Sequence, residues 1–583
     1  MTSRVNRGLR LGVSLALPLA LVLSALFMPT AWYDTLPRTP DLPARPMRGT
    51  TLLRAILALQ AVMTGILALR GWRWTPLPDT LRATGFAPRT DAYDVSESTA
   101  RRWLLLITLV GLVLRVAGIG ADLWTDELMT IDQTVPMSFG EIIGSYQSSN
   151  NHLLMSLLIK ASVMVFGVHE WSIRMSTAAF GIASITALYR VARLAMSRRA
   201  SLGASLLLAV SYHHVFFSQN ARGYVAYVFF ALLATRALID ALRDDHLSDW
   251  VQYGAATVLG MMALLNAAFV IAAQLLVVIV VAWQRWRQTG HIAPLVWRLV
   301  GVYTITGLCC IGVYAVALPD AYLYITSAYT LGQTGASATS NDLLQMFVRG
   351  VLEGFGPGVA AAAIPFLALA TAGFVVLWRR QWAMTALLLL PGVLTALLLA
   401  WRGMTFSPRF FLLWLPLAVL TAVVTIDAIA ARLWRAQPAR RQLASSVVVA
   451  AVATLSALSL VRYYRVPKQP FSATLQYVER VRAADDLVLA IRPTWLGVHY
   501  YGEKQQLPLD RNYVEIGEVT TLDSVMAARG IRRVRLITTL EHVIEQSRPE
   551  LMAKLYAGWQ RDTTLAATIG GGAITVWSER ARR

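Results

Sequence analysis

The sequence contains very little cysteine and comparatively few acidic residues. Its two cysteines, Cys309 and Cys310, are neighbours within one apolar run, so they offer neither the spacing of a metal site nor a disulfide framework. Aspartate and glutamate number 33 against 53 lysines and arginines, which gives a net charge of +20. A nucleic-acid-binding protein of this charge is expected to carry a basic patch interleaved with aromatic residues. The sequence has no such patch, and we therefore expect no nucleic-acid partner.

The sequence also lacks the polar composition of a soluble protein. Hydrophobic residues make up 56% of the chain and its mean hydropathy is +0.52, whereas soluble domains are about 45–50% apolar. The excess falls in long blocks, which indicates an all-α polytopic membrane protein.

Thirteen of these blocks have about the length needed to cross a bilayer, roughly 17–25 residues. Arginines cluster in alternate connecting segments, and the positive-inside rule places those segments in the cytoplasm. We therefore predict a multi-pass protein of the cytoplasmic (inner) membrane, with its N-terminus inside and its first span retained. The predicted spans lie near residues 10–28, 51–70, 103–120, 171–192, 201–217, 223–243, 250–265, 267–284, 296–318, 357–378, 382–400, 409–432 and 443–462.

The same alternation predicts two long loops on the outer face, 121–170 and 319–356. The first loop contains an apolar block, residues 153–166, that is too short to span and is interpreted as a juxtamembrane helix. The second loop is a candidate cover for a cavity and a candidate contact for an acceptor, because long outer loops are often functional. Its candidate residues are Tyr322, Tyr324 and Asp342.

The tail 464–583 has a different pattern, because its charge density rises and its apolar runs shorten to the length of strands. Runs at 486–491, 533–538 and 573–577 predict strands, and helical patterns lie at 472–483 and 522–529. Gly570 to Gly572 lies between short β-like runs and is interpreted as a hairpin turn. We therefore predict three parts: two N-terminal spans with a cytoplasmic linker (1–102), a membrane domain (103–463) and a small soluble α/β domain outside the membrane (464–583).

An acidic pair, Asp126 and Glu127, follows directly after the apolar run 103–120. Burying a charge without a partner is costly, so carboxylates at the edge of a span are seldom there for packing. A desolvated carboxylate can have its pKa raised toward the range useful for a general base. On a helix, neighbouring residues point about 100° apart, so one acid can face a cavity while the other holds the loop. A solvated loop or a helix N-cap remains an alternative explanation.

Several cationic or hydrogen-bonding residues are predicted on the same outer face. His152 precedes the juxtamembrane helix, Arg222 and Tyr224 begin a span, and Arg409 occupies an equivalent position later in the chain. An arginine suits a phosphate partner because its donors form a fixed fork. The alternatives are a structural hydrogen bond for His152 and snorkelling for the arginines.

Five short motifs in a fixed order carry a resemblance to a known family: Leu123-Trp-Thr-Asp-Glu127, Asn150-Asn-His152, Gly167-Val-His-Glu-Trp-Ser-Ile-Arg174, Ser218-Gln-Asn-Ala-Arg-Gly-Tyr224 and Ser407-Pro-Arg-Phe410. Across residues 103–465 the chain resembles the GT-C glycosyltransferase superfamily, and it looks most like the branch of protein O-mannosyltransferases and the lipid A aminoarabinose transferase. The resemblance implies a polyprenyl-phosphate sugar donor, an active site on the outer face and an inverting transfer. The acceptor would be a glycan, lipid or protein hydroxyl, with membrane lipids as surroundings.

The resemblance also implies roles for individual residues. Asp126 matches the catalytic aspartate and Glu127 its companion, while His152, Arg222, Tyr224 and Arg409 match the region that binds the donor phosphate. The family often has two prolines where Leu153 and Leu154 stand here. A divalent metal requirement is left open, because the residues form no complete ligand set. The rival interpretations are a lipid or small-solute transporter or flippase, and a non-catalytic assembly protein.

Overall fold

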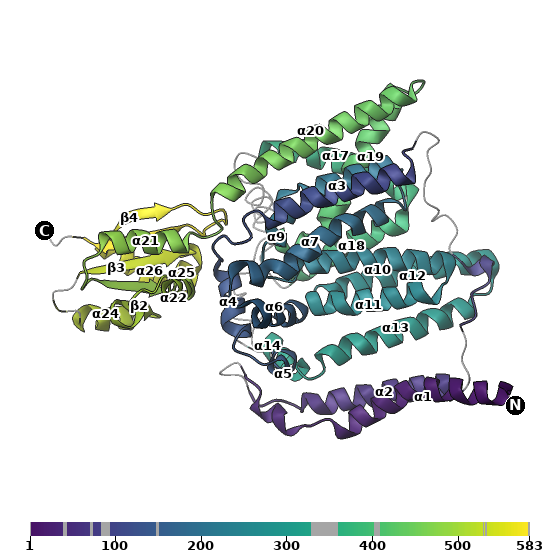
Figure 1. The fold of residues 1–583 in the computed structure, drawn as a ribbon, viewed down its shortest axis with the longest axis horizontal. Helices are drawn as coiled ribbons and strands as arrows, with labels where there is room; N and C mark the ends of the chain where they lie inside the picture. The colour runs from purple at the N-terminus through teal and green to yellow at the C-terminus, as the bar shows by residue number, and fades with distance from the viewer. Residues whose placement is uncertain are drawn as a thin grey trace. The chain divides into compact units, whose positions relative to one another are not determined.

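The computed structural model describes residues 2–38, 43–69, 74–82, 94–146, 151–327, 360–401, 408–528, 530 and 533–580. Most of these residues are helical, and the C-terminal part forms a mixed sheet (Figure 1). The chain divides into two units. The first comprises 1–115, 137–158 and 176–456, and the second comprises 116–136, 159–175 and 457–583.

Long apolar helices account for most of the first unit. Each of the thirteen predicted spans overlaps one of them, except that 201–217 corresponds to two short helices, α8 and α9. The helices are α1 (Thr2–Phe27), α2 (Gly49–Leu69), α3 (Glu97–Val116), α7 (Glu170–Ala192), α8 (Arg198–Ala209), α9 (Tyr212–Ser218), α10 (Tyr224–Asp244), α11 (Leu247–Ala263), α12 (Ala267–Thr289), α13 (Ala293–Tyr314), α17 (Ala360–Arg380), α18 (Trp382–Trp401), α19 (Trp414–Leu433) and α20 (Pro438–Arg465).

Seven of these helices are long and apolar enough to cross a membrane, namely α2, α10, α12, α13, α18, α19 and α20. The number rises to eight if α8 and α9, which are bent by 59°, form one broken span. The chain is therefore a mostly helical, multi-pass membrane protein. Helices suit this setting because all their backbone hydrogen bonds are made within the segment. The expected total of thirteen spans stays a prediction.

Four shorter helices lie in the described parts of the predicted outer loops. The loop 121–170 contains α5 (Phe139–Gly144) and α6 (Leu153–Phe166) in addition to α4 (Thr125–Thr134), and the loop 319–356 begins with α14 (Leu318–Thr326). At 14 residues, α6 is shorter than a span, in line with the length of its apolar block.

The C-terminal sheet has five strands in the order β2-β1-β3-β5-β4. β1 (Leu487–Ile491) pairs in parallel with β2 (Tyr513–Ile516) and β3 (Val534–Thr539). β5 (Ile574–Glu579) is antiparallel to β3 and to β4 (Trp559–Leu565), and Gly570 to Gly572 lies in the connection between β4 and β5. The predicted strands correspond to β1, β3 and β5, and the mixed sheet confirms a C-terminal domain of helices and strands.

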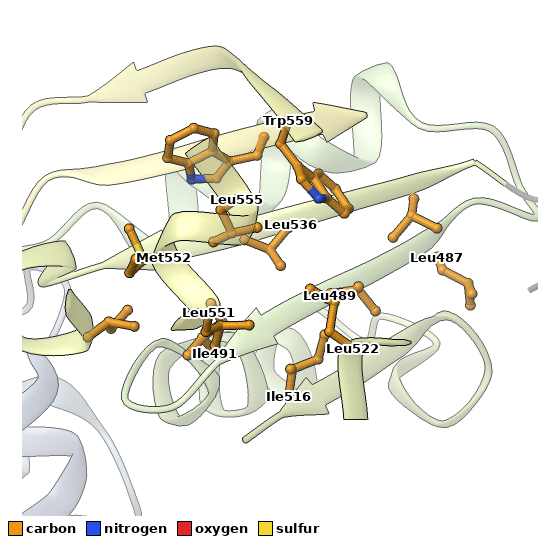
Figure 2. Packing of buried hydrophobic residues seen from close by; sticks show 13 residues of the cluster. Leu487, Leu489, Ile491, Ile516, Leu522, Leu536, Leu551, Met552, Leu555 and Trp559 are labelled. Carbon is orange, nitrogen blue, oxygen red and sulfur yellow. The ribbon is translucent and has the colours of Figure 1, made fainter. Parts of the chain in front are cut away.

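Helices cover both faces of this sheet. The interior strand β1 is buried at every position, which requires cover on each side. Figure 2 shows Leu487, Leu489 and Ile491 of β1 packed with residues of α24 (Val519–Ala528) and α26 (Pro549–Gly558). Their spacing of two places them on one face of the strand. The helices α21 (Phe471–Val481) and α22 (Thr494–Lys504) also pack against the sheet, and α25 (Glu541–Ser547) contacts α26.

Candidate active site

The acidic pair lies in the first turn of α4, in the second unit. The backbone N–H of Trp124, the residue before the helix, donates to Glu127 Oε2 at 3.3 Å. An acid at this position also interacts favourably with the helix dipole. Trp124 is the N-cap residue, and Glu127 helps to begin the helix from the third position of the first turn.

Glu127 is completely buried and forms a two-bond ion pair with Arg174. The Arg174 Nε and Nη2 atoms lie 2.8 and 2.6 Å from the two carboxylate oxygens. The Lys468 ammonium lies 3.7 Å from Glu127 Oε2, and the three side chains are only 0–4% exposed. Such a buried charge is tolerated only when it is paired and hydrogen-bonded. We name these three residues the Glu127 clamp.

The clamp also holds the loop that precedes α4. Arg174 donates to the backbone carbonyls of Ile119 at 3.0 Å, Ala121 at 2.6 Å and Asp122 at 3.0 Å. Each bond joins a buried cation to a carbonyl that would otherwise need another donor. Arg174 therefore fixes the backbone on the N-terminal side of Asp126.

Residues of the C-terminal tail hold the same loop from a second direction. Gln469 Oε1 accepts hydrogen bonds from the Thr125 backbone N–H at 2.6 Å and from its hydroxyl at 2.9 Å. The Tyr501 hydroxyl accepts from the Leu123 N–H at 2.6 Å. Ser472 donates twice to the Asp122 carboxylate, from its N–H and its hydroxyl, each at 2.8 Å. The tail thus supplies partners for three positions of this segment, Asp122, Leu123 and Thr125.

Burial shifts the pKa values of two groups around the loop. It lowers the pKa of the Lys468 ammonium to about 7, although the Glu127 carboxylate opposes this shift. Burial also raises the pKa of the Asp122 carboxyl, against the hydrogen bonds from Ser472. Lys468 therefore changes charge near neutral pH.

Asp126 has different surroundings from its neighbour. It is half-buried, whereas Glu127 is inaccessible. Because adjacent helical residues point about 100° apart, Asp126 faces away from the direction of the Glu127 clamp. The hydrogen bonds to residues 119–125 and the pairing of Glu127 fix the backbone next to Asp126, and Asp126 itself remains half-buried.

The basic residues predicted for the donor phosphate lie in the first unit. Arg222 Nε donates to His152 Nε2 at 2.9 Å, and His152 Nδ1 lies 3.3 Å from the Ala263 carbonyl oxygen. Burial and the charge of Arg222 hold the pKa of His152 well below its ordinary value. His152 is therefore neutral, with its proton on Nδ1, and it orients the Arg222 side chain.

Tyr224 and Arg409 belong to the same neighbourhood. The Tyr224 ring lies edge-on to the His152 ring at 5.4 Å, and the Arg222 guanidinium is 5.8 Å from the Tyr224 ring centre. Arg409, in the short helix Pro408–Phe411, is close enough for its charge to depress the pKa of His152 further. The structure thus brings together all four residues predicted for phosphate binding.

A close backbone approach makes this cluster possible. A Cβ atom at Gly223 would lie 1.8 Å from the Ala263 carbonyl oxygen and 2.9 Å from His152 Nδ1. A side chain at this position would therefore collide with the end of α11 and with His152, the hydrogen-bond partner of Arg222.

Asn220 was not singled out from the sequence, although it lies in the same motif. Its neighbours are all engaged: the Ser218 hydroxyl accepts from Arg115 Nε, and Gln219 Nε2 donates to the Arg115 carbonyl. Asn220 is completely buried, and neither polar atom of its side chain has a hydrogen-bond partner among the described residues. Since buried polar groups are normally paired, Asn220 marks a position where a ligand or water completes the bonding.

The predicted acceptor residues are only partly described. Tyr322 and Tyr324 lie on α14; Tyr322 is 60% exposed, and the Tyr324 ring lies edge-on to Tyr146 at 5.7 Å. Asp342 lies outside the described residues. Within the described part of the chain, no group of three or more His, Cys, Asp or Glu side chains is placed to hold a metal ion.

Arg174 and Lys468 were missed as site residues. Arg174 could have been found, because it ends one of the five motifs, whereas nothing in the local sequence distinguishes Lys468. Asp126 and the Glu127 clamp belong to the second unit, and His152, Arg222, Tyr224 and Arg409 belong to the first.

Comparisons with known proteins agree with the resemblance found in the sequence. Residues 151–306 match the family described as dolichyl-phosphate-mannose-protein mannosyltransferase. This range contains His152, Arg174, Arg222 and Tyr224. No curated protein is significantly similar to the sequence.

Three solved structures are similar to this chain at low identity. ArnT from Cupriavidus metallidurans bound to undecaprenyl phosphate is 13% identical, with 83% of this chain and 99% of that chain covered and a TM-score of 0.45. Oligosaccharyltransferase AglB from Archaeoglobus fulgidus, in complex with an inhibitory peptide and a dolichol-phosphate, is 11% identical over 82% and 74%, with a TM-score of 0.47. Arabinosyltransferase EmbB from Mycobacterium smegmatis is 13% identical over 75% and 47%, with a TM-score of 0.39.

Proposed function

We propose that this chain is a membrane glycosyltransferase that transfers a sugar from a polyprenyl-phosphate donor to a hydroxyl of a cell-envelope acceptor. The match of residues 151–306 to the family described as dolichyl-phosphate-mannose-protein mannosyltransferase supports this proposal. The acceptor is a lipid, a glycan or a protein. The reaction takes place on the outer face of the cytoplasmic membrane. In the proposed topology the chain crosses the membrane thirteen times, its N-terminus lies in the cytoplasm, and residues 464–583 lie outside.

The observation that carries this proposal is that Glu127 is buried in an ion pair whereas its neighbour Asp126 is only half-buried. Both carboxylate oxygens of Glu127 are paired with Arg174, and the loop before α4 is hydrogen-bonded by Arg174 and by residues of the C-terminal tail. The backbone of Asp126 is thereby held in a fixed position, and the residue is half-buried. Positioning of this kind lowers the activation free energy of group transfer, because the reacting groups have already lost their orientational entropy before the reaction begins.

In the proposed reaction, Asp126 accepts the proton of the acceptor hydroxyl. The hydroxyl oxygen forms a bond to the anomeric carbon, and the bond from that carbon to the phosphate oxygen breaks. The phosphate oxygen leaves with the bonding electrons as polyprenyl phosphate. Attack from the face opposite the leaving group inverts the anomeric configuration in one displacement.

The basic cluster stabilises the phosphate as negative charge develops on its leaving oxygen. Arg222 and Arg409 carry the positive charge, and the neutral His152 orients Arg222 through its Nε donor. Charge-assisted bonds from arginine to phosphate are stronger than neutral ones and fix the geometry. Preorganised electrostatics are often the largest single contribution to catalysis. The side-chain amide of Asn220, which has no hydrogen-bond partner among the described residues, then forms hydrogen bonds to the polyprenyl-phosphate sugar.

The direct test compares turnover of wild type, Asp126→Asn and Asp485→Asn with a labelled polyprenyl-phosphate sugar and envelope membranes as the acceptor source. Loss of a general base costs about 10²–10⁴-fold, so we expect that decrease for Asp126→Asn. Asp485 is an exposed acid of the same unit, and its amide variant should keep wild-type turnover. Near-wild-type turnover by Asp126→Asn removes Asp126 from the mechanism. A wild-type chain that moves the labelled donor across vesicles unchanged is a flippase instead.

A further inference from the structure

A concave site lies in the second unit, between α4 and α22. Its volume is about 320 Å³, which is at the lower end of the range of small-ligand sites. Apolar residues of α4 form one wall. The side of α22 carries polar and aromatic residues, namely Arg492, Trp495, His499, Tyr500 and Glu503. We call this site the α4–α22 groove.

Helix geometry places the groove away from the reacting centre. Leu128, Ile131, Asp132 and Val135 line it from α4, and their spacing of three, four and seven residues defines one helix face. Asp126 lies two residues before Leu128. At about 100° per residue, Asp126 points roughly 160–200° away from the middle of that face. The groove is therefore not where the sugar is transferred.

The chemistry of the lining matches a saccharide. Trp495 and Tyr500 offer flat apolar faces, on which the C–H face of a sugar ring can stack. Asp132 and Glu503 offer carboxylates, and Arg492 offers planar donors, which suit pairs of neighbouring hydroxyl groups. One arginine among two carboxylates does not create the positive site that a phosphate requires. The lining thus favours a neutral ligand with many hydroxyl groups.

The polar side chains of the groove are free to exchange partners. His499 Nε2 lies 3.6 Å from Glu503 Oε1, with side chains 51% and 65% exposed. Arg492 Nε lies 3.1 Å from Glu515 Oε1, and its side chain is 59% exposed. Exposed ion pairs contribute roughly 0–1 kcal/mol. A ligand can therefore replace them at little cost in stability.

We propose that the α4–α22 groove binds a saccharide segment of the acceptor, at a distance from the hydroxyl that reacts. This inference rests on the proposed function, because it names the acceptor of that reaction as a glycan or a glycan-bearing molecule. Binding energy from a remote part of a substrate holds its reacting part in place. The groove lies on the helix that carries Asp126, so the bound segment is registered against the catalytic loop.

The binding test uses the full chain in detergent and isothermal titration calorimetry with mannotriose, cellotriose and chitotriose. We expect at least one trisaccharide to bind at one site with a millimolar dissociation constant. Trp495→Ala should weaken that binding by at least about tenfold, which corresponds to the loss of roughly 1.4 kcal/mol. Tyr556→Ala is the control, because Tyr556 is a 40% exposed aromatic residue of the same unit outside the groove.

Two outcomes overturn the proposal. One is that none of the three trisaccharides binds, and the other is that Trp495→Ala binds them as well as wild type does. In the first case, binding of a serine- and threonine-rich peptide would assign the groove to a protein acceptor. Neither outcome depends on donor turnover.

Kinetics separate this proposal from the proposed function. With envelope membranes as acceptor, Trp495→Ala should raise KM for the acceptor and leave kcat unchanged, whereas Asp126→Asn lowers kcat. A chain that binds a trisaccharide through Trp495 but never consumes the donor contradicts the proposed function alone. If the chain consumes the donor and Trp495→Ala leaves KM for the acceptor unchanged, only the proposal for the groove is contradicted.

Discussion

At the level of single residues, Glu127 and Asp126 are adjacent acids with opposite energetic roles. Glu127→Gln would leave Arg174 and Lys468 buried without their carboxylate, and breaking a buried pair in this way costs about 3–5 kcal/mol. Asp126→Asn keeps nearly the same side-chain shape and leaves the Glu127 clamp intact, so it should destabilise the protein less than Glu127→Gln does. Thermal unfolding of the two variants in detergent, with Glu545→Gln as an exposed control, measures the difference. Equal stability of the two variants would contradict the structural role of the clamp.

The pKa of Lys468 leads to a prediction about pH. In the folded protein its pKa is about 7, whereas an unfolded lysine titrates near 10.4. Between these values the unfolded state holds a proton that the folded state has released, so stability rises with pH. Below pH of about 7 both states hold the proton, and Lys468 adds no slope.

This contribution can be isolated by substitution. Lys468→Met should flatten the rise in unfolding temperature between pH 7 and pH 9, relative to wild type, because the linked proton is gone. The measurement is thermal unfolding at several pH values in one detergent. Parallel curves for wild type and Lys468→Met would show that Lys468 keeps its ordinary pKa.

Asn220 tests whether a buried polar group serves a ligand or the fold. An amide that lacks partners costs about 1–3 kcal/mol, so Asn220→Ala should not destabilise the empty protein as the loss of a structural asparagine would. Undecaprenyl phosphate should raise the unfolding temperature of wild type by binding the folded state. A smaller rise is expected for Asn220→Ala. An equal rise with lower basal stability would make Asn220 a structural residue.

The predicted site residues illustrate what sequence can and cannot reveal at this scale. His152, Arg222, Tyr224 and Arg409 were recognisable because the motif order and the topology placed them on one face. The neutral state of His152 was not predictable, since it depends on burial and on the charge of Arg222. Lys468 was equally hidden, because only the folded chain brings it within 3.7 Å of Glu127 Oε2.

At the level of elements, the turn between α9 and α10 depends on one glycine. A Cβ atom at Gly223 would meet the Ala263 carbonyl oxygen at 1.8 Å, and overpacking of this kind costs about 1–3 kcal/mol. Gly223→Ala should therefore lower both the unfolding temperature and the affinity for undecaprenyl phosphate. Gly301→Ala is the matched control, because no neighbouring atom lies within 4 Å of its Cβ position in α13. There the change should be neutral or stabilising.

The secondary structure was most predictable where apolar runs are long. The helices overlap all the predicted spans because the hydrophobic blocks and their charged flanks mark both ends. In the tail, β1, β3 and β5 were visible as apolar runs, but β2 and β4 were not. β2 has only four residues, and β4 has the sequence Trp-Gln-Arg-Asp-Thr-Thr-Leu with a register shift. Pairing with neighbouring strands, which no local pattern records, makes these two segments strands.

For the whole molecule, the number of spans fixes the side of each connecting segment. Seven spans and thirteen spans both place the chain ends on opposite sides of the membrane, whereas eight spans place them on the same side. The connection between α12 and α13 separates the first two cases. With the N-terminus inside, thirteen spans leave His291 in the cytoplasm, and seven spans place it outside.

Cysteine labelling resolves the three cases in intact cells. In a chain that lacks Cys309 and Cys310, a single cysteine is introduced by His291→Cys or by Glu545→Cys, both at exposed positions. We expect a membrane-impermeant maleimide to label Glu545→Cys and to label His291→Cys only after the cells are opened. That result agrees with thirteen spans and excludes seven. We expect it because thirteen spans place all the arginine-rich connecting segments in the cytoplasm. Labelling of His291→Cys in intact cells would support seven spans. Protection of Glu545→Cys would support eight, and would also place the tail on the wrong side for a reaction at the outer face.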